Sequence, residues 1–314
     1  MKTLGFAIVI ASLCTFTSCN ERSKRKDLSP EESASSSISA PIKFIQVDSL
    51  KIAYKVVGKG KPIIFLQRFR GTLNDWDPAF VDAVAKKYQV ILFDAPGVGL
   101  STGKVQTSVT KWADQAVQFA HNLGIDHSVY LGWSMGGAVA QVIAINHPDN
   151  VDKLVLLGTG PSGNLDFVPG NPEFGLRARK PVYGFDDYQF LFFYKSESAK
   201  VACASYLKRV DMIKEKDIDT KPASYQNMSI AMSDFKANKE RDYFSHLKDI
   251  KQPVLIADGK FDPSYPLMNS SVLEREIPNS KLILYPDAGH GFLFQYYVEF
   301  VPELLAFIAS DNKL

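Results

Sequence analysis

From Phe44 onward, short apolar runs alternate with longer amphipathic stretches. Runs rich in β-branched and aromatic residues are typical of strands, and stretches with apolar positions at helical spacing are typical of helices. The expected strands are residues 50–57, 63–66, 90–93, 129–131, 154–157, 254–256 and 282–284. The expected helices are residues 77–87, 110–123, 135–146, 264–276 and 296–309. This alternation predicts an α/β fold, in which helices flank a mostly parallel central sheet.

The predicted strands are of two kinds. Residues 50–57 alternate between apolar and polar side chains, as in an exposed hairpin strand near the start of a domain. The other runs are continuously apolar, which is typical of strands whose two faces are both covered by helices. The continuous runs therefore predict a sheet buried between two helical layers.

One long segment, residues 161–250, interrupts the alternation and contains no comparable strand run. It is too long to be an unstructured loop inside a compact domain, it is rich in Tyr and Phe, and part of it has helical periodicity. We interpret it as a helical cap inserted into a core formed by residues 43–160 and 251–314. The alternative is a helical lobe with a purely structural role.

The first 42 residues differ in composition from the rest. Residues 1–18 combine Lys2, a short apolar run and small residues, which is the layout of an export signal and is too short for a membrane span. Cys19 follows small residues, as in the signals of bacterial lipoproteins, so we predict that it carries a lipid. Residues 19–42 are mostly polar and predict a flexible tether. The predicted location is the bacterial cell envelope; the alternative is an ordinary secretory signal.

Composition and charge narrow the possible functions. Hydrophobic residues make up 46% of the 314-residue chain and charged residues 22%, which argues against global disorder and against a protein with many membrane spans. The 36 basic residues nearly balance the 34 acidic ones, which argues against nucleic acid as a partner. The few Cys and His residues are scattered along the chain, so no metal site and no cofactor are expected.

The strongest chemical motif is Gly-Trp-Ser-Met-Gly at residues 132–136. It lies between a predicted strand and a predicted helix, which is the position of a nucleophile elbow. Such a turn is tight enough to require small flanking residues, and it presents its serine above the edge of the sheet. The motif predicts that Ser134 is a nucleophile.

A serine nucleophile needs a general base, and that base needs an acid to orient it. Asp262 follows the predicted strand 254–256, and His290 follows the predicted strand 282–284. Both therefore lie where the carboxyl ends of parallel strands gather functional groups. We predict a triad of Ser134, Asp262 and His290, with Asp258 as a less favoured alternative acid.

These motifs together resemble those of the α/β-hydrolase-fold serine hydrolases. The sequences Gly-Trp-Ser-Met-Gly-Gly, Gly-Lys-Phe-Asp and Ala-Gly-His-Gly resemble those of its esterases, cofactor-free haloperoxidases and meta-cleavage-product hydrolases. The sequence Asp-Ala-Pro-Gly-Val-Gly-Leu-Ser at residues 94–101 is also similar to a loop of this family. The resemblance extends from about residue 43 to the end of the chain.

The chain departs from the family pattern at the loop after residues 63–66. The family usually has His-Gly there, whereas this chain has Gln67 and Arg68. The resemblance implies that the backbone N–H groups of Phe69 and Met135 form the oxyanion hole. Backbone donors do not depend on the side chain, so the change leaves this expectation in place. Arg68 and Arg70 could instead favour an anionic group on the substrate.

The sequence thus predicts an enzyme that hydrolyses a small, apolar carboxylic ester through an acyl-enzyme on Ser134. Two alternatives remain open. The same triad could hydrolyse a C–C bond or form a peracid, and the fold could also serve as a non-catalytic receptor. The expected partners are a small-molecule substrate and a membrane reached through the lipid anchor; the oligomeric state cannot be predicted from the sequence.

Overall fold

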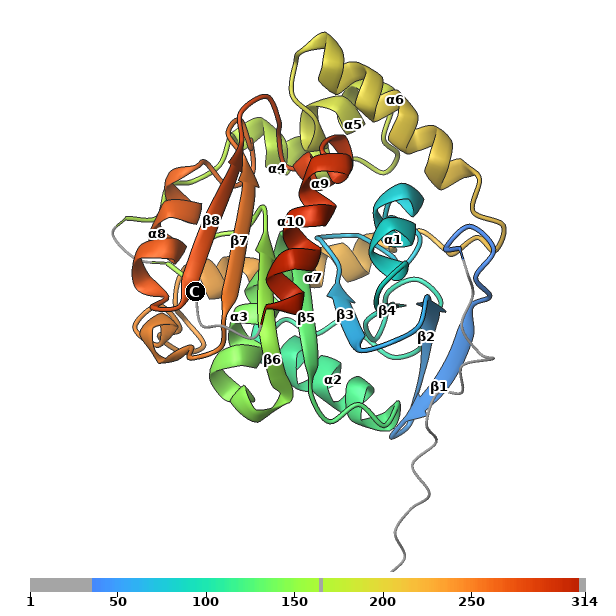
Figure 1. The fold of residues 1–314 in the computed structure, drawn as a ribbon, viewed down its shortest axis with the longest axis vertical. Coiled ribbons are helices and arrows are strands. Elements are labelled where there is room, and N and C mark those ends of the chain that lie inside the picture. Colours follow the sequence, from blue (N-terminus) through green and yellow to red (C-terminus); the bar gives the residue numbers. More distant parts are fainter. Residues whose placement is uncertain (1–35, 164–165, 311–314) are drawn as a thin grey trace, which may run out of the picture.

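The computed structural model describes residues 36–163 and 166–310, which form an eight-stranded sheet with helices on both sides (Figure 1). The strand order is β1-β2-β4-β3-β5-β6-β7-β8, and β2 runs antiparallel to both of its neighbours while the other pairs are parallel. The strands are β1 (Lys43–Val47), β2 (Leu50–Val57), β3 (Pro62–Leu66), β4 (Gln89–Phe93), β5 (Ser128–Trp133), β6 (Val151–Leu157), β7 (Val254–Gly259) and β8 (Ser280–Tyr285). The predicted α/β class is confirmed.

Successive side chains of the central strands enter two different cores. In β3, Phe65 packs with Phe80 of α1 (Pro78–Ala85) and Phe300 of α10 (Tyr297–Ala309). The next residue, Leu66, points to the opposite face and packs with α2 (Val109–Asn122), α3 (Met135–Asn146) and α8 (Met268–Glu276). Because both faces are covered, the central strands are continuously apolar in sequence.

The inserted segment is helical. It contains α4 (Pro172–Ala178), α5 (Phe185–Phe192), α6 (Glu197–Asp211), α7 (Pro222–Lys236) and the short helix η3 (Leu247–Asp249). Figure 1 shows α4, α5 and α6 above one end of the sheet. The short helices η2 (Pro148–Asn150) and α9 (Phe292–Gln295) belong to the core. The cap therefore lies close to the edge where the functional loops emerge.

Three details differ from the predictions. The strand β2 is not exposed: it lies between β1 and β4, and its residues from Ile52 to Val57 are buried. The strand β8 forms an edge of the sheet, so Leu284 is 40% exposed rather than covered on both faces. The helix predicted from residue 264 begins at Met268, because the N–H groups of Ser264 and Tyr265 in the preceding turn donate to Asp262.

The start of the folded region also differs from the prediction. The predicted signal, Cys19 and most of the tether lie outside the described residues, but residues 36–42 belong to the folded structure. The Ser36 hydroxyl and the Ser37 N–H donate to the carboxylate of Asp82 in α1, both at 2.7 Å. Ala40 is fully buried. The prediction of a flexible tether up to residue 42 is therefore wrong for these last residues.

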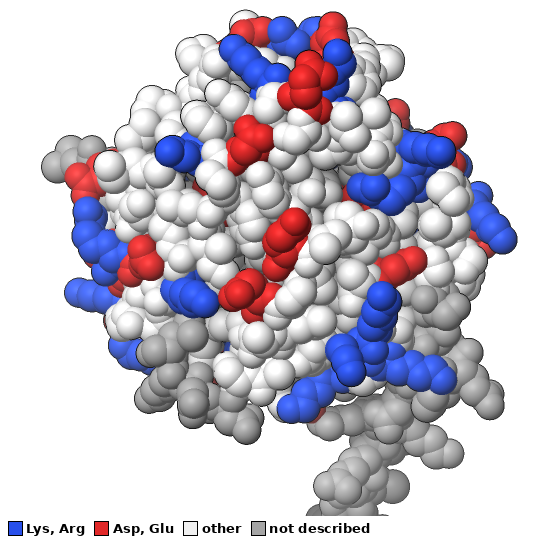
Figure 2. Space-filling view, turned by 45° about the horizontal axis from the view of Figure 1, so that its top comes forward, with Lys and Arg blue, Asp and Glu red and all other residues white. Residues whose placement is uncertain are grey.

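Charge distribution and helix hydropathy describe the exterior of the folded part. On the face shown in Figure 2, acidic and basic side chains are scattered over a mostly uncharged surface. Among residues 36–163 and 166–310, no helix is both long enough and apolar enough to cross a bilayer.

Candidate active site

Ser134 occupies a strained turn between β5 and α3. Its backbone has a φ of +58°, a conformation that non-glycine residues rarely adopt. The turn is packed from both sides: a Cβ on Gly132 would collide with the backbone of Gly136, and one on Gly136 with the carbonyl of Leu66. The Ser134 N–H donates to the Leu157 carbonyl at 2.8 Å. The local sequence thus holds the hydroxyl at the carboxyl end of β5.

Asp262 and His290 lie in direct contact. His290 Nδ1 is 2.6 Å from Asp262 Oδ2, and both side chains are buried. The other carboxylate oxygen of Asp262 accepts the N–H groups of Ser264 and Tyr265 at 2.6 and 2.9 Å. A carboxylate held in this way accepts a proton-bearing Nδ1, which leaves Nε2 of the neutral imidazole free to accept a proton.

Burial determines the protonation of this pair. It lowers the pKa of His290 to about 3, because the charged imidazolium loses its water of hydration. Burial also raises the pKa of Asp262, while its two backbone donors oppose that rise by stabilising the carboxylate. His290 is therefore neutral near pH 7, as a general base must be.

Asp258, the alternative acid, occupies a different position. Its Oδ2 accepts the Ser270 hydroxyl at 2.5 Å, and its Oδ1 accepts the Gly259 N–H at 2.8 Å. Burial and the neighbouring charge of Asp262 raise the pKa of Asp258 well above its usual value. A protonated Asp258 donates to Asp262, so it supports the acid that contacts the histidine.

Neighbouring residues connect the turn that holds Ser134 to the loop that holds His290. The Trp133 indole N–H donates to the His290 carbonyl at 2.9 Å. Gly158, which follows β6, leaves room for the pair: a Cβ there would lie 3.1 Å from His290 Nδ1 and 3.3 Å from Asp262 Oδ2. The Ser134 hydroxyl makes no hydrogen bond to another residue in the described part of the chain, and it opens into a cavity.

The two residues predicted to supply the oxyanion donors both border this cavity. Phe69 and Met135 line its wall together with Ser134. Within the described residues, neither the Phe69 N–H nor the Met135 N–H has an acceptor. The Gln67 side chain orders the loop, since its Nε2 donates to the Thr72 carbonyl and its Oε1 accepts the Arg68 N–H, both at 2.8 Å.

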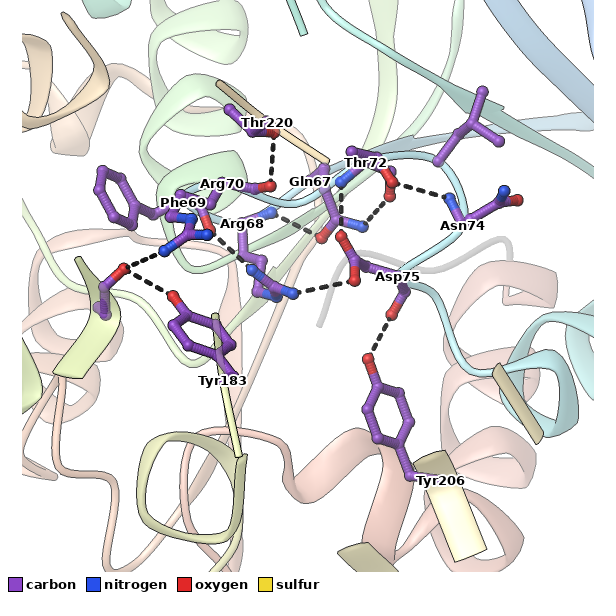
Figure 3. Close-up of polar contacts among 12 residues, drawn as sticks. Gln67, Arg68, Phe69, Arg70, Thr72, Asn74, Asp75, Tyr183, Tyr206 and Thr220 are labelled. Carbon is purple, nitrogen blue, oxygen red and sulfur yellow. Dashed lines mark hydrogen bonds and ion pairs between the residues drawn. The ribbon is translucent and has the colours of Figure 1, made fainter. Parts of the chain in front are cut away.

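The two arginines beside Phe69 are held by the protein itself, as Figure 3 shows. The Arg68 guanidinium, only 5% exposed, donates to the Phe69 carbonyl at 2.8 Å and pairs with Asp75 at 3.2 Å. Arg70 donates to cap carbonyls at Ala178 and Lys180. These groups fix the loop and attach it to the cap, and they do not line the cavity that contains Ser134.

The cavity has a volume of about 370 Å³ and lies between the core and the cap. Its apolar wall comes mainly from Phe69, Met135, Phe174, Ala178, Met232 and Tyr265. Two cationic residues, Arg179 and Lys236, also line it, whereas no Asp or Glu does among the described residues. The site is therefore an apolar pocket with positive charge, and the serine opens into it.

Sequence reasoning missed several residues of this site. Lys236 and Tyr265 line the cavity, and Gly158 makes room for the acid–base pair. A signal for Lys236 existed: Ser229, Met232, Ser233 and Lys236 recur at helical spacing and form one face of α7. Over residues 36–163 and 166–310, no three His, Cys, Asp or Glu side chains gather as a metal site requires.

Comparison with known proteins agrees with this fold. A family described as the alpha/beta hydrolase fold matches residues 61–296. A 2-hydroxy-6-oxononadienedioate/2-hydroxy-6-oxononatrienedioate hydrolase from Paraburkholderia phymatum is 29% identical over 83% of this chain and 92% of its own length. A non-heme haloperoxidase from Rhodococcus erythropolis is 29% identical over 84% of this chain and 97% of its own. The solved structure of an alpha/beta hydrolase fold protein from Chitinophaga pinensis is 30% identical in sequence. The match covers 86% of this chain and 98% of that chain, with a TM-score of 0.80.

Proposed function

Because the chain belongs to the alpha/beta hydrolase fold family, we propose that it is a serine hydrolase acting on a small carboxylic ester. The observation that carries the proposal is the arrangement of the strained Ser134, the buried Asp262–His290 pair and the cavity into which the serine opens. The apolar wall favours an apolar portion on the substrate. The family alone does not determine the substrate.

The proposed reaction has two steps. His290 takes the proton of the Ser134 hydroxyl, whose oxygen attacks the ester carbonyl, and the N–H groups of Phe69 and Met135 stabilise the oxyanion. The ester C–O bond then breaks, and His290 returns its proton to the departing alcohol. Water attacks the acyl-enzyme by the same route and releases the acid, so ester and water yield acid and alcohol.

A second candidate is hydrolysis of a C–C bond by the same residues. It is supported by the similarity to the 2-hydroxy-6-oxononadienedioate/2-hydroxy-6-oxononatrienedioate hydrolase. Perhydrolysis, in which hydrogen peroxide replaces water, is a third, supported by the similarity to the non-heme haloperoxidase. The three differ in substrate and in the attacking molecule, and they all require Ser134.

The test is turnover of para-nitrophenyl esters of short acids by the wild-type protein and by Ser134→Ala. We expect turnover by the wild type and a loss of at least about a thousandfold in the variant. A fluorophosphonate should label the wild type at Ser134 and leave the variant unlabelled. Turnover that survives in Ser134→Ala would contradict the site. No turnover and no labelling would favour the non-catalytic receptor.

We also propose that the protein is attached to a membrane of the bacterial cell envelope by a lipid on Cys19, a residue outside the described range. The support is the sequence of residues 1–19 alone. When the full chain is expressed in a bacterium, it should partition into detergent, and Cys19→Ser should move it to the aqueous phase. Equal partition of the two proteins would contradict the anchor.

A further inference from the structure

The cavity beside Ser134 contains a cation that the proposed reaction does not use. Lys236 is the last residue of α7 and is partly buried. No ion pair or hydrogen bond satisfies its ammonium group within the described residues. Its Nζ lies 4.6 Å from the ring centroid of Tyr265 and 5.4 Å from that of Phe167. Two aromatic faces therefore hold a positive charge in the wall of a mainly apolar cavity.

This cation lies close to the reacting groups. Tyr265 stacks against His290 with ring centroids 6.3 Å apart, so one ring separates the ammonium group from the base. The charges of Lys236 and Asp262 interact electrostatically, although the two groups form no ion pair. A substrate bound at Ser134 therefore lies within reach of Lys236.

The residues around Lys236 favour the binding of an anion in the cavity. One face of α7 presents Ser229, Ser233 and Lys236 to the cavity, and Arg179 contributes a second cation at its exposed side. The Ser229 hydroxyl donates to the Tyr225 carbonyl at 2.9 Å, whereas the Ser233 hydroxyl has no partner among the described residues. No acidic side chain among those residues lines the cavity.

The two arginines beside Phe69, Arg68 and Arg70, are not available to bind an anion in the cavity. Arg68 pairs with Asp75, and Arg70 is bound to cap carbonyls, so both guanidinium groups already have acceptors. Burial lowers the pKa of Lys236 to about 8, yet most of the lysine still carries its proton at pH 7. Lys236 is thus the less exposed of the two cationic residues, Arg179 and Lys236, that line the cavity.

We propose that Lys236, assisted by the Ser233 hydroxyl, binds a carboxylate on the substrate, so that the enzyme prefers esters that carry a free acid group. This inference rests on the proposed ester hydrolysis and names its substrate class. An anion in a low-dielectric cavity gains more from a cation than it would in water, which gives the interaction its selectivity.

The experiment compares para-nitrophenyl half-esters of succinic, glutaric and adipic acid with para-nitrophenyl esters of neutral acids of the same chain length. Rates without enzyme are subtracted, because the half-esters also react with their own carboxylate. The readout is the ratio of kcat/KM for the charged ester to that for the neutral one. For the best chain length, we expect the wild type to favour the charged ester about tenfold to a hundredfold, the range of one charge-assisted hydrogen bond.

Substitutions of Lys236 test whether this residue causes the preference for the charged ester. Lys236→Met should bring the ratio near one, Lys236→Arg should retain part of it, and Lys236→Glu should invert it. Lys239→Met is the matched control, because Lys239 lies three residues further on, is exposed and pairs with Asp234 at 3.0 Å. The control should keep the wild-type ratio. Equal losses on both esters in Lys236→Met would mean that the lysine acts on the triad, and they would overturn the proposal.

The failures of the two proposals can be distinguished. Turnover of neutral esters that depends on Ser134, with no preference for a charged ester at any chain length, would overturn only the carboxylate site. If no ester is turned over, calorimetry still tests the inference with the glutarate and adipate dianions. The site is supported if the wild type binds a dianion and Lys236→Met binds it about tenfold or more weakly. It is rejected if the variant binds as tightly as the wild type, or if neither protein binds detectably.

Discussion

The indole nitrogen of Trp133 donates a hydrogen bond of 2.9 Å to the carbonyl oxygen of His290. Trp133 precedes Ser134 in the chain, so one side chain connects the turn that holds Ser134 to the loop that holds His290. Its ring is fully buried and packs against Phe192 and Phe294. The separation of Ser134 and His290, the two groups proposed to react, therefore depends on a tryptophan that also packs against the His290 ring.

Trp133→Phe tests this connection. The variant keeps an aromatic ring but leaves the buried His290 carbonyl without its donor, which costs about 1–3 kcal/mol. We expect a lower melting temperature and a loss of about tenfold in kcat and in the rate of fluorophosphonate labelling. The matched control is Trp112→Phe, because Trp112 also donates to a carbonyl, that of Gln106 at 3.0 Å, but makes no hydrogen bond to the loops of Asp262 and His290 among the described residues. Equal kinetic effects of both variants would contradict a positioning role.

Asp262→Asn tests which carboxylate orients the base. An amide can donate to Nδ1 and favour the wrong tautomer of His290, so we expect a loss of about ten-thousandfold in kcat. The measurement is ester turnover, with circular dichroism to confirm that the protein is folded.

Asp258→Asn is the paired comparison for this position. Asparagine still has an N–H to donate toward Asp262, so we expect a loss smaller than about tenfold. A larger loss at Asp258 than at Asp262 would show that the acid is assigned to the wrong residue.

Gln67→Ala tests the unusual loop beside Phe69. The variant removes the two hydrogen bonds that fix the loop, to the Thr72 carbonyl and from the Arg68 N–H. Because the Phe69 N–H acts mainly on the transition state, we expect kcat to fall about tenfold or more while KM changes less. Gln118→Ala, which removes a hydrogen bond to Asp48 in the turn between β1 and β2, should leave both constants near the wild type. A change in KM alone would show that the loop binds substrate without holding the oxyanion.

The pH dependence follows from the burial of His290. Burial lowers the pKa of His290, so the imidazole stays neutral and active as the pH falls below the usual value of about 6.5. Protonation removes His290 as a base only when the pH falls through this lowered pKa. We expect the acid limb of kcat/KM to have its midpoint below 6.5, measured with a neutral ester. A midpoint above 7 would show that the base is more hydrated than the structure indicates.

The layout of the core could be predicted because each signal was local. Strands buried on both faces have a continuous apolar sequence, and the turn at Ser134 requires glycines at fixed positions. Asp262 and His290 were found because each follows a strand run, and parallel strands bring such loops together. The structure places these two side chains in contact.

Other features depend on contacts that no local pattern encodes. The helix α8 begins at Met268 because the N–H groups of Ser264 and Tyr265 bond to Asp262 instead of starting a helix. The strand β8 has the apolar run of an interior strand, but its place at the sheet edge depends on strand order. The helical spacing of residues 229–236 indicates which side chains share a face of α7, but the position of that face in the cavity beside Ser134 depends on how the cap packs on the core.

The packed segment from Ser36 to Ile42 has a practical consequence for producing the protein. Besides its bonds to Asp82, the segment joins the loop between α6 and α7: the Lys214 N–H donates to the Ile38 carbonyl at 3.0 Å, and the Ile42 N–H to the Glu215 carboxylate at 2.6 Å. The same few residues therefore attach the cap to the core, although they lie far along the chain from Ser134, Asp262 and His290. A shortened protein that starts at the first strand would lack these hydrogen bonds to the loop between α6 and α7, so a truncated form should begin upstream of Ser36.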